Sequence, residues 1–325
     1  MIVSGSDRLV RGGWIPFEER TRHQMRVRDK FLASIDDFNI IGNPIKGDDT
    51  KVARLSHFGK LINGGKFLPT FWQFTGSCVG QGWSQAVRHL SIIEILKLGQ
   101  PELALMPWFG YIYGRSRTRG GLNGRGEGSF GSAAAEAVLK DGVIHCGENG
   151  VPTPAFSIDG NNSLIWGRDR ATASSNEMVW SDGARISQNL ITQGRKNLVK
   201  SAAQVTTAKQ VVEALLNGYP VPVASNAGFE RMERKNGKLW GRRSGTWMHQ
   251  MLWIDVDLTG PDPAVLTWNS WSTTAHPRPE DDSPPGSFWI TLDDVEFMAR
   301  QGDTFAISQF DGFPAQKLRV EDFLI

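Results

Sequence analysis

The spacing of apolar residues changes partway along the 325-residue chain, and this change limits the possible folds more than any other feature. From Cys78 to Leu98 apolar side chains recur at helical spacing. Shorter helices are predicted at Ser132–Lys140 and Thr207–Leu216, and Trp108–Tyr113 begins a second apolar piece that fits either a helix or a strand. After Val205 the apolar runs become strand-like and are separated by Gly and Pro turns, giving predicted strands at Val221–Ala224, Trp247–Asp257, Ala264–Trp268, Ser287–Thr291 and Thr304–Gln309. Helices followed by antiparallel strands predict an α+β chain with two packed lobes.

The same patterns divide the chain into three segments. Residues 1–68 are polar, contain a short amphipathic piece at Lys30–Phe38, and are expected to form an extended N-terminal segment. Residues 69–200 are expected to form a helical lobe, and residues 201–325 a strand-rich lobe. The region of about 144–201 is polar and rich in Ser and Asn, so we predict long loops there.

Three glycines predict local constraints. Gly80 and Gly82 are poor helix formers in the first turns of the 78–98 helix, which indicates that another group approaches the backbone closely there. Gly142 follows the predicted helix at Ser132–Lys140 and is expected to end it in the left-handed conformation.

Composition excludes several classes of function. There are 36 Lys and Arg against 34 Asp and Glu, so the net charge of +2 gives no reason to expect nucleic acid as a partner. The sequence contains no run of about 18 apolar residues, so we expect no membrane-spanning helix. The first residues lack the apolar core of a signal peptide, so we expect a cytoplasmic or assembly-associated protein that no standard signal peptide exports. The two cysteines, Cys78 and Cys146, exclude a disulfide scaffold and are expected to be free thiols.

Four residues in a fixed order predict thiol chemistry. Cys78 begins a helix in QFTGSCVGQGW, and Gln73 precedes it by five positions. His249 lies in one predicted strand, and Asn269 ends the next. A thiol is a weak nucleophile at neutral pH, an imidazole can take its proton, and an amide can orient that imidazole. A helix N-terminus and a protonated imidazole are both expected to lower the pKa of the Cys78 thiol.

Each of these residues therefore receives a predicted role. Cys78 is the nucleophile, and His249 is the general base and acid. Asn269 orients His249, and Gln73 donates to the oxyanion together with the Cys78 backbone N–H. Trp271 is expected to shield the bond between His249 and Asn269 from water. A symmetric register about the turn between the two strands places His249 opposite a position slightly beyond Asn269, so spacing alone leaves their contact open.

Taken singly, these residues also have simpler interpretations. A lone Cys at a helix start is usually a buried inert thiol. Only the presence of Gln73, His249 and Asn-Ser-Trp in the family order favours a peptidase-type site. The other histidines (His23, His57, His89, His145 and His276) lack ligand spacing, so we expect surface or capping roles for them and neither a metal nor a cofactor. Residues 126–131 match G-x-G-x-x-G. The only candidate strand before them, around Trp108–Tyr113, ends a dozen residues earlier, which argues against a dinucleotide site.

With these residues the chain resembles the papain-like cysteine peptidases of the C1 family, and within it the bacterial-type branch that lacks the usual disulfides. The similar stretches cover about residues 70–310 in family order: Gln73 with Gly76-Ser77-Cys78, Glu127-Gly128-Ser129, AKQVVEALLNGYPVPVAS, Met248-His249, Asn269-Ser270-Trp271 and Gly286-Ser287-Phe288-Trp289. The resemblance implies a two-lobed fold, with a helical lobe, an antiparallel β-barrel-like lobe and a cleft between them. It implies hydrolysis of peptide or related amide bonds through an acyl-thioenzyme, with the substrate backbone bound near Gly126, Glu127, Gly128 and Ser129.

Departures from the family pattern leave a second hypothesis open. Met248 and Gln250 stand where smaller residues are usual, and bulk beside His249 would narrow the cleft. Ser272 follows Asn-Ser-Trp where a Gly is usual, and residues 1–68 show no recognisable inhibitory pro-segment. The alternative to a peptidase acting on peptide or protein substrates is a peptidase-fold structural or binding component of a larger assembly, such as a virus or phage particle. Its catalysis would be weak or absent, and residues 1–68 would contact the assembly.

Overall fold

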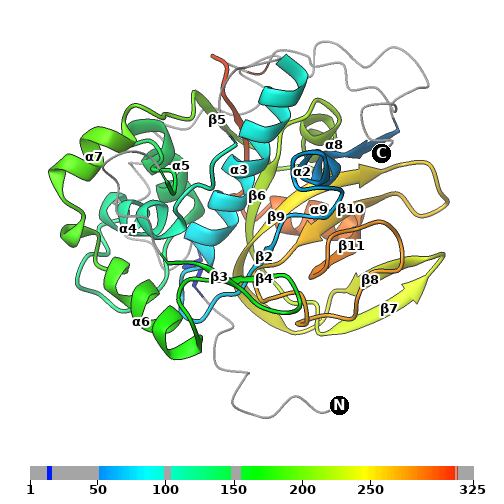
Figure 1. Cartoon of the computed structure of the whole chain (residues 1–325). Helices are drawn as coiled ribbons and strands as arrows, with labels where there is room; N and C mark the ends of the chain where they lie inside the picture. The colour runs from blue at the N-terminus through cyan, green and yellow to red at the C-terminus, as the bar shows by residue number, and fades with distance from the viewer. Residues whose placement is uncertain (1–12, 17–50, 99–103, 148–154, 312, 314–325) are drawn as a thin grey trace.

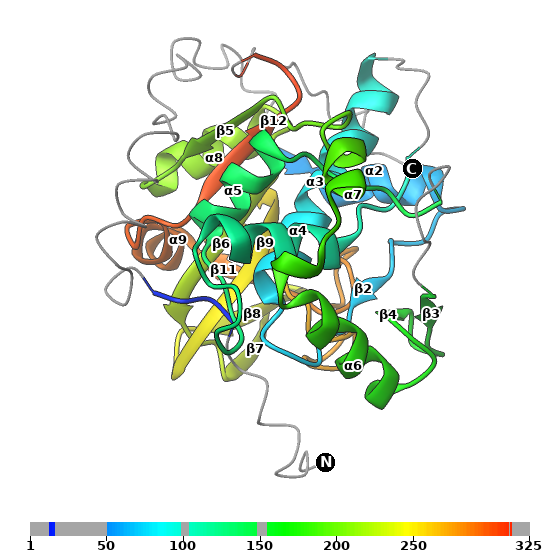
Figure 2. The same ribbon diagram turned by 90° about the vertical axis from the view of Figure 1, so that its left-hand side faces the viewer.

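The computed structural model describes residues 13–16, 51–98, 104–147, 155–311 and 313. Within these ranges, a group of helices and a large sheet lie on opposite sides of the long helix α3 (Cys78–Leu98), as Figure 1 and Figure 2 show. The predicted amphipathic piece at Lys30–Phe38 lies outside them. None of the described helices is long and apolar enough to cross a membrane.

The helical side packs on α3 mainly through α4 (Phe109–Arg119). It also contains α5 (Gly131–Lys140), α6 (Arg170–Trp180) and α7 (Gln188–Gly194). The prediction for the α3 glycines is confirmed: a Cβ on Gly80 would lie 2.6 Å from the Cβ of Tyr113 in α4, and one on Gly82 would lie 2.8 Å from the Cγ of Gln250. Gly142 has a φ of +71° after α5, which confirms the predicted left-handed stop.

The large sheet is built around one long central strand, β9 (Thr246–Asp257). The sheet order is β1-β9-β10-β11-β8-β7, and β6 also pairs with β9. The remaining strands are β1 (Val52–Arg54), β6 (Val221–Ala227), β7 (Arg231–Lys235), β8 (Lys238–Arg242), β10 (Ala264–Trp268) and β11 (Ser287–Thr291). Pairing on both edges, together with α3 packed on its face, keeps β9 in place, and its first residues carry His249.

Smaller elements complete the described fold. One small sheet has the order β2-β4-β3, formed by β2 (Thr70–Phe71), β4 (Ser163–Ile165) and β3 (Ser157–Ile158). β5 (Ser201–Gln204) pairs with β12 (Phe305–Ser308). Helices α8 (Ala208–Leu216) and α9 (Leu292–Ala299) pack on each other and on β6. The large sheet is open in the described part of the chain, whereas the resemblance implied a barrel-like lobe.

Two stretches differ from the sequence-based expectation. The region of about 144–201, predicted to be long loops, contains β3, β4, α6 and α7. Both helices begin at polar caps, since Asp169 accepts from the N–H of Thr172 and Ser187 from that of Leu190. The β7–β8 hairpin was also missed, although its Asn236-Gly237 turn, with both residues at positive φ, is a common hairpin signal.

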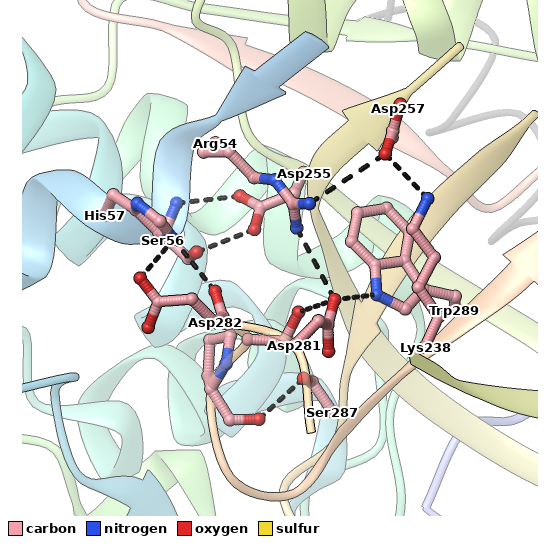
Figure 3. A network of polar contacts seen from close by, with 12 residues as sticks. Arg54, Ser56, His57, Lys238, Asp255, Asp257, Asp281, Asp282, Ser287 and Trp289 are labelled. Atoms are coloured by element: carbon pink, nitrogen blue, oxygen red, sulfur yellow. Dashed lines mark hydrogen bonds and ion pairs between the residues drawn. The ribbon is translucent and has the colours of Figure 1, made fainter. Parts of the chain in front are cut away.

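Part of the N-terminal segment belongs to the sheet. β1 pairs with the end of β9, and α2 (Leu55–Ile62) follows it directly. Figure 3 shows the polar network that joins them: the N–H and Oγ of Ser56 donate to the buried carboxylate of Asp255 at 2.8 and 2.7 Å. Burial raises the pKa of Asp255, while the charge of Arg54 opposes this effect. Asp281 and Asp282, in the loop before β11, close the network, with Trp289 Nε1 donating to Asp281 at 2.7 Å.

Candidate active site

Cys78 lies at the N-terminus of α3 and is fully buried. The backbone N–H groups of Val79 and Cys78 itself point to its sulfur from the first helical turn, and the N–H of Gln250 reaches it from β9. These donors favour the thiolate, but burial outweighs them and raises the pKa of Cys78 to about 12, with a smaller contribution from the charge of Glu177. The expectation of a lowered thiol pKa is therefore wrong for this covered state.

His249 and Asn269 are in direct contact. Nε2 of His249 lies 2.8 Å from Oδ1 of Asn269, and the N–H of Ser270 donates to the same oxygen at 2.7 Å. Nδ1 of His249 has no hydrogen-bond partner among the described residues, the Cys78 thiol included. Burial lowers the pKa of His249 to about 4 against the opposing effect of Asn269, so the imidazole is neutral at pH 7.

Trp271 lies flat against the His249 ring. The ring centroids are 4.4 Å apart and the planes are inclined by 25°. Trp268, the last residue of β10, pairs with Leu252 of β9 in the antiparallel register. If this register continues for three more residues beyond β10, Trp271 lies opposite His249. Trp271 also forms a bridge with Trp72, which places the segment after Asn269 against the segment before Cys78. The contact that spacing left open is thus made by Asn269 from just beyond the end of β10.

Gln73 connects the same two segments and is buried. Its Nε2 donates to the carbonyl of Thr75 at 2.6 Å, and its Oε1 accepts from Oγ of Ser270 at 3.1 Å. Its backbone N–H also donates to the carbonyl of Ser270 at 2.9 Å. The side chain is therefore held in one orientation beside the loop that leads into Cys78.

A buried carboxylate that sequence reasoning missed holds this loop. Glu177 of α6 accepts from the backbone N–H of Thr75 at 3.0 Å, from Oγ1 of Thr75 at 2.7 Å and from Oγ of Ser77 at 2.7 Å. Burial raises its pKa to about 7, although these hydrogen bonds favour the charged form. Nothing in the sequence singled it out, since α6 lies in a region predicted to be loops.

The glycine-rich stretch at Gly126–Ser129 lies beside the nucleophile loop. The exposed Glu127 accepts from the N–H of Gly76 through its carboxylate. Gly128, at a φ of +93°, donates its N–H to the hydroxyl of Tyr113 at 2.9 Å and its carbonyl accepts from Arg117. These contacts fix the stretch against α4.

Residues 13–16 occupy the space next to Cys78. Ser129 donates its N–H to the carbonyl of Gly13 at 2.6 Å and accepts from the N–H of Ile15 at 2.9 Å, forming a short parallel bridge around Trp14. The N–H groups of Gly13 and Trp14 both donate to the carbonyl of Met248, at 3.0 and 3.1 Å. The Trp14 side chain is buried and its Nε1 donates to Asp303 at 2.6 Å.

Gly13 lies directly over the sulfur. A Cβ added to Gly13 would be 2.7 Å from Sγ of Cys78 and 2.4 Å from the carbonyl oxygen of Gly76. Residues 13–16 therefore cover the nucleophile, although no inhibitory segment is recognisable in the sequence of residues 1–68. Gln250, whose bulk was expected to narrow the cleft, is buried and packs on Gly82 of α3.

His276 is a further residue of this site, and the expectation of a surface or capping role is wrong for it. Its Nε2 lies 2.9 Å from Nδ2 of Asn269. Its ring stacks on Trp247 at 6.0 Å and meets the edge of Phe288 at 5.0 Å. Only its proximity to Asn269 in the sequence hinted at this, because a loop returns it to the site.

The remaining candidates lie away from this chemistry. α5 begins at Gly131, at the end of the G-x-G-x-x-G match, and its Gly131 and Ser132 N–H groups donate to Asp303 at 2.8 and 2.7 Å. The protein's own carboxylate thus fills the position that a phosphate would take. Cys146 is a half-buried free thiol, as expected. In the described ranges no group of three or more His, Cys, Asp or Glu is arranged to hold a metal ion.

Comparison with solved structures identifies the fold. Xylellain, a cysteine protease from Xylella fastidiosa, is similar with a TM-score of 0.55 at 15% sequence identity, over 95% of this chain and 99% of that one. The proform of the ragweed pollen cysteine protease Amb a 11 has a TM-score of 0.51 at 9% identity, over 90% and 76% of the two chains. No protein-family model and no curated protein matches the sequence. The chain has the two-lobed fold of the papain-like cysteine proteases, which confirms the predicted fold class.

Proposed function

We propose that the chain is a cysteine peptidase that hydrolyses peptide or related amide bonds through an acyl-thioenzyme, and that residues 13–16 keep it latent. One arrangement carries the proposal. Nε2 of His249 is bound to Asn269 while its Nδ1 has no partner among the described residues, and the next residue, Gln250, directs its N–H to the Cys78 sulfur. An accepting imidazole nitrogen thus lies on the strand that contacts the thiol.

The proposed reaction begins when residues 13–16 leave the cleft. Nδ1 of His249 takes the proton of Cys78, and the thiolate attacks the carbonyl carbon of the substrate. The negative charge on the carbonyl oxygen is stabilised by the Cys78 N–H and by the second amide hydrogen of Gln73, since the first already binds Thr75. His249 then gives its proton to the leaving amine as the carbon–nitrogen bond breaks. Water, deprotonated by His249, hydrolyses the thioester and restores the thiol.

Substitution of the nucleophile tests the proposal. Cys78→Ala should abolish cleavage of an unfolded protein substrate and labelling by a thiol-directed epoxide inhibitor, without loss of the folded state. Cys146→Ala is the matched control, because it removes the second, half-buried thiol and should leave both readouts intact. Mass spectrometry of the labelled chain identifies the modified residue. Equal labelling with and without Cys78→Ala, in a chain whose contact between Gly13 and Cys78 has been weakened, would exclude Cys78 as the reactive group.

The covered thiol also supports the second candidate, a binding component without catalysis. A buried thiol with a pKa of about 12 is inert as long as residues 13–16 stay in place. If the cleft never opens, the fold serves only as a scaffold, and its partners would be other proteins of an assembly. The two candidates differ in a variant that weakens the contact of Gly13 with Cys78: a latent peptidase gains reactivity, whereas a scaffold does not.

A further inference from the structure

Asn269 joins two histidines that come from different parts of the fold. Its Oδ1 lies 2.8 Å from Nε2 of His249 on β9, and its Nδ2 lies 2.9 Å from Nε2 of His276 in the loop between β10 and β11. The amide is therefore bound at both ends. Neither a metal nor a charged side chain takes part in these two contacts.

The backbone N–H of Ser270 determines which atom of the Asn269 amide is the oxygen and which is the nitrogen. The N–H of Ser270 donates to Oδ1 of Asn269 at 2.7 Å, and a backbone N–H can only donate. Oδ1 is then the acceptor for His249, whose Nε2 must carry the hydrogen. Nδ2 is the donor toward His276, whose Nε2 must be unprotonated. Each ring thus has one defined tautomer, and in His249 it leaves Nδ1 free to accept a proton.

The loop that carries His276 is strained and fastened at both ends. Ser272 has a φ of +76°, a conformation that costs a non-glycine residue free energy and persists only where its surroundings require it. The N–H of Ser272 donates to the carbonyl of Phe71 at 3.0 Å, and at the far end Trp289 binds Asp281 at 2.7 Å. Trp247 stacks on the His276 ring, and Phe288 meets it edge-on. These contacts together hold the His276 imidazole against Asn269.

We propose that His276 is a positioning residue of the active site, whose neutral Nε2 holds the Asn269 amide in the orientation that makes His249 a base toward Cys78. The role rests on the proposed function and concerns the same site. An amide turned by 180° would present Nδ2 to His249, force the hydrogen onto Nδ1 and leave the thiol without an acceptor. His276 and the Ser270 N–H oppose that flip from two sides. Burial and the nearby His249 both lower the pKa of His276, which keeps its Nε2 an acceptor at neutral pH.

Tautomer measurement on the full chain tests the assignment without any need for turnover. Two-dimensional NMR of chain labelled with ¹⁵N-histidine should show His249 protonated at Nε2 and His276 protonated at Nδ1, the tautomer that neutral histidine in water populates less. In His276→Phe, which keeps an aromatic ring between Trp247 and Phe288, the His249 Nε2–H signal should weaken or exchange rapidly. His276→Gln retains an acceptor oxygen and should restore it. A His276 protonated at Nε2, or a His249 signal unchanged in His276→Phe, would overturn the proposal.

Kinetics give a second readout. On a peptide that the parent chain cleaves, loss of one neutral hydrogen bond predicts a fall in kcat of about three- to tenfold for His276→Phe, with KM unchanged. His276→Gln should recover most of it, and His145→Phe, a half-buried histidine outside the site, should have no effect. A fall in Tm of equal size in His276→Phe and His276→Gln, with no recovery of kcat, would make His276 merely structural. If neither the parent chain nor a variant that weakens the contact of Gly13 with Cys78 cleaves any peptide, the proposed function fails, and the NMR result still decides the role of His276.

Discussion

Replacement of Gly13 by Ala should open the cleft with a single methyl group. The added Cβ would lie 2.4 Å from the carbonyl oxygen of Gly76 and 2.7 Å from Sγ of Cys78, far inside normal contact distance. Gly76 cannot easily yield, because Glu127 binds its N–H and Glu177 holds the residues on either side of it. Overpacking of this kind costs about 1–3 kcal/mol. If the strain acts on residues 13–16, the open population rises by about 5- to 150-fold, at 1.4 kcal/mol for each factor of ten.

Alkylation of Cys78 by a small thiol reagent measures that population. When closing is faster than the chemical step, the observed rate is proportional to the open fraction, so Gly13→Ala should react about 5- to 150-fold faster than the parent chain. Cys146 provides an internal reference, because it is already half-exposed and should react at the same rate in both chains. Gly160→Ala is the matched control, since a Cβ there meets no atom within 4 Å and its φ is not positive. An unchanged Cys78 rate in Gly13→Ala, or an equal gain in Gly160→Ala, would refute the reasoning.

Two further predictions concern Glu177 and Ser272. Burial raises the pKa of Glu177 from 4.5 to about 7, so between these values the folded chain holds a proton that the unfolded chain has lost. The free energy of unfolding should therefore fall as pH rises through this window, and urea titrations of Glu177→Gln should lack that part of the slope. An equal slope in both chains would contradict this. Ser272→Gly should raise the free energy of unfolding by about 1 kcal/mol, because Gly accepts the φ of +76° without a steric cost. A lower urea midpoint would show that the contacts of the Ser272 hydroxyl with Thr274 outweigh the strain.

The sequence predicted elements well where its signals are local. β10 and β11 were placed at their observed bounds because each is a short apolar run that begins directly after a turn residue, Pro263 or Gly286. α6 and α7 were missed because they are short and polar, and their stability comes from Asp169 and Ser187 caps and from packing on α4.

The residues of the site differ in the same way: some have a local signal in the sequence and others do not. The order of Cys78, His249 and Asn269 is visible in the chain, because each residue type carries its chemistry with it. His276 and Glu177 were not visible, since their roles depend on where a loop and a helix return in space. The thiol pKa was expected to shift in the wrong direction for the same reason. Its dominant cause is burial, and one covering group, Gly13, lies 65 positions before Cys78 (78 − 13 = 65).

In the proposed open state, Cys78 would keep every group that favours its reactive form. The N–H groups of Val79, Cys78 and Gln250 surround the sulfur even while it is buried, and each favours the thiolate. With the thiol pKa at about 12 and the His249 pKa at about 4, proton transfer between them is strongly unfavourable in the covered state. Departure of residues 13–16 would admit water and so remove the burial that raises the Cys78 pKa and lowers the His249 pKa. The N–H groups that favour the thiolate would stay in place. In the proposed mechanism, cleft opening therefore precedes proton transfer. Reagents that trap the thiolate should then report the opening equilibrium before they report the chemistry.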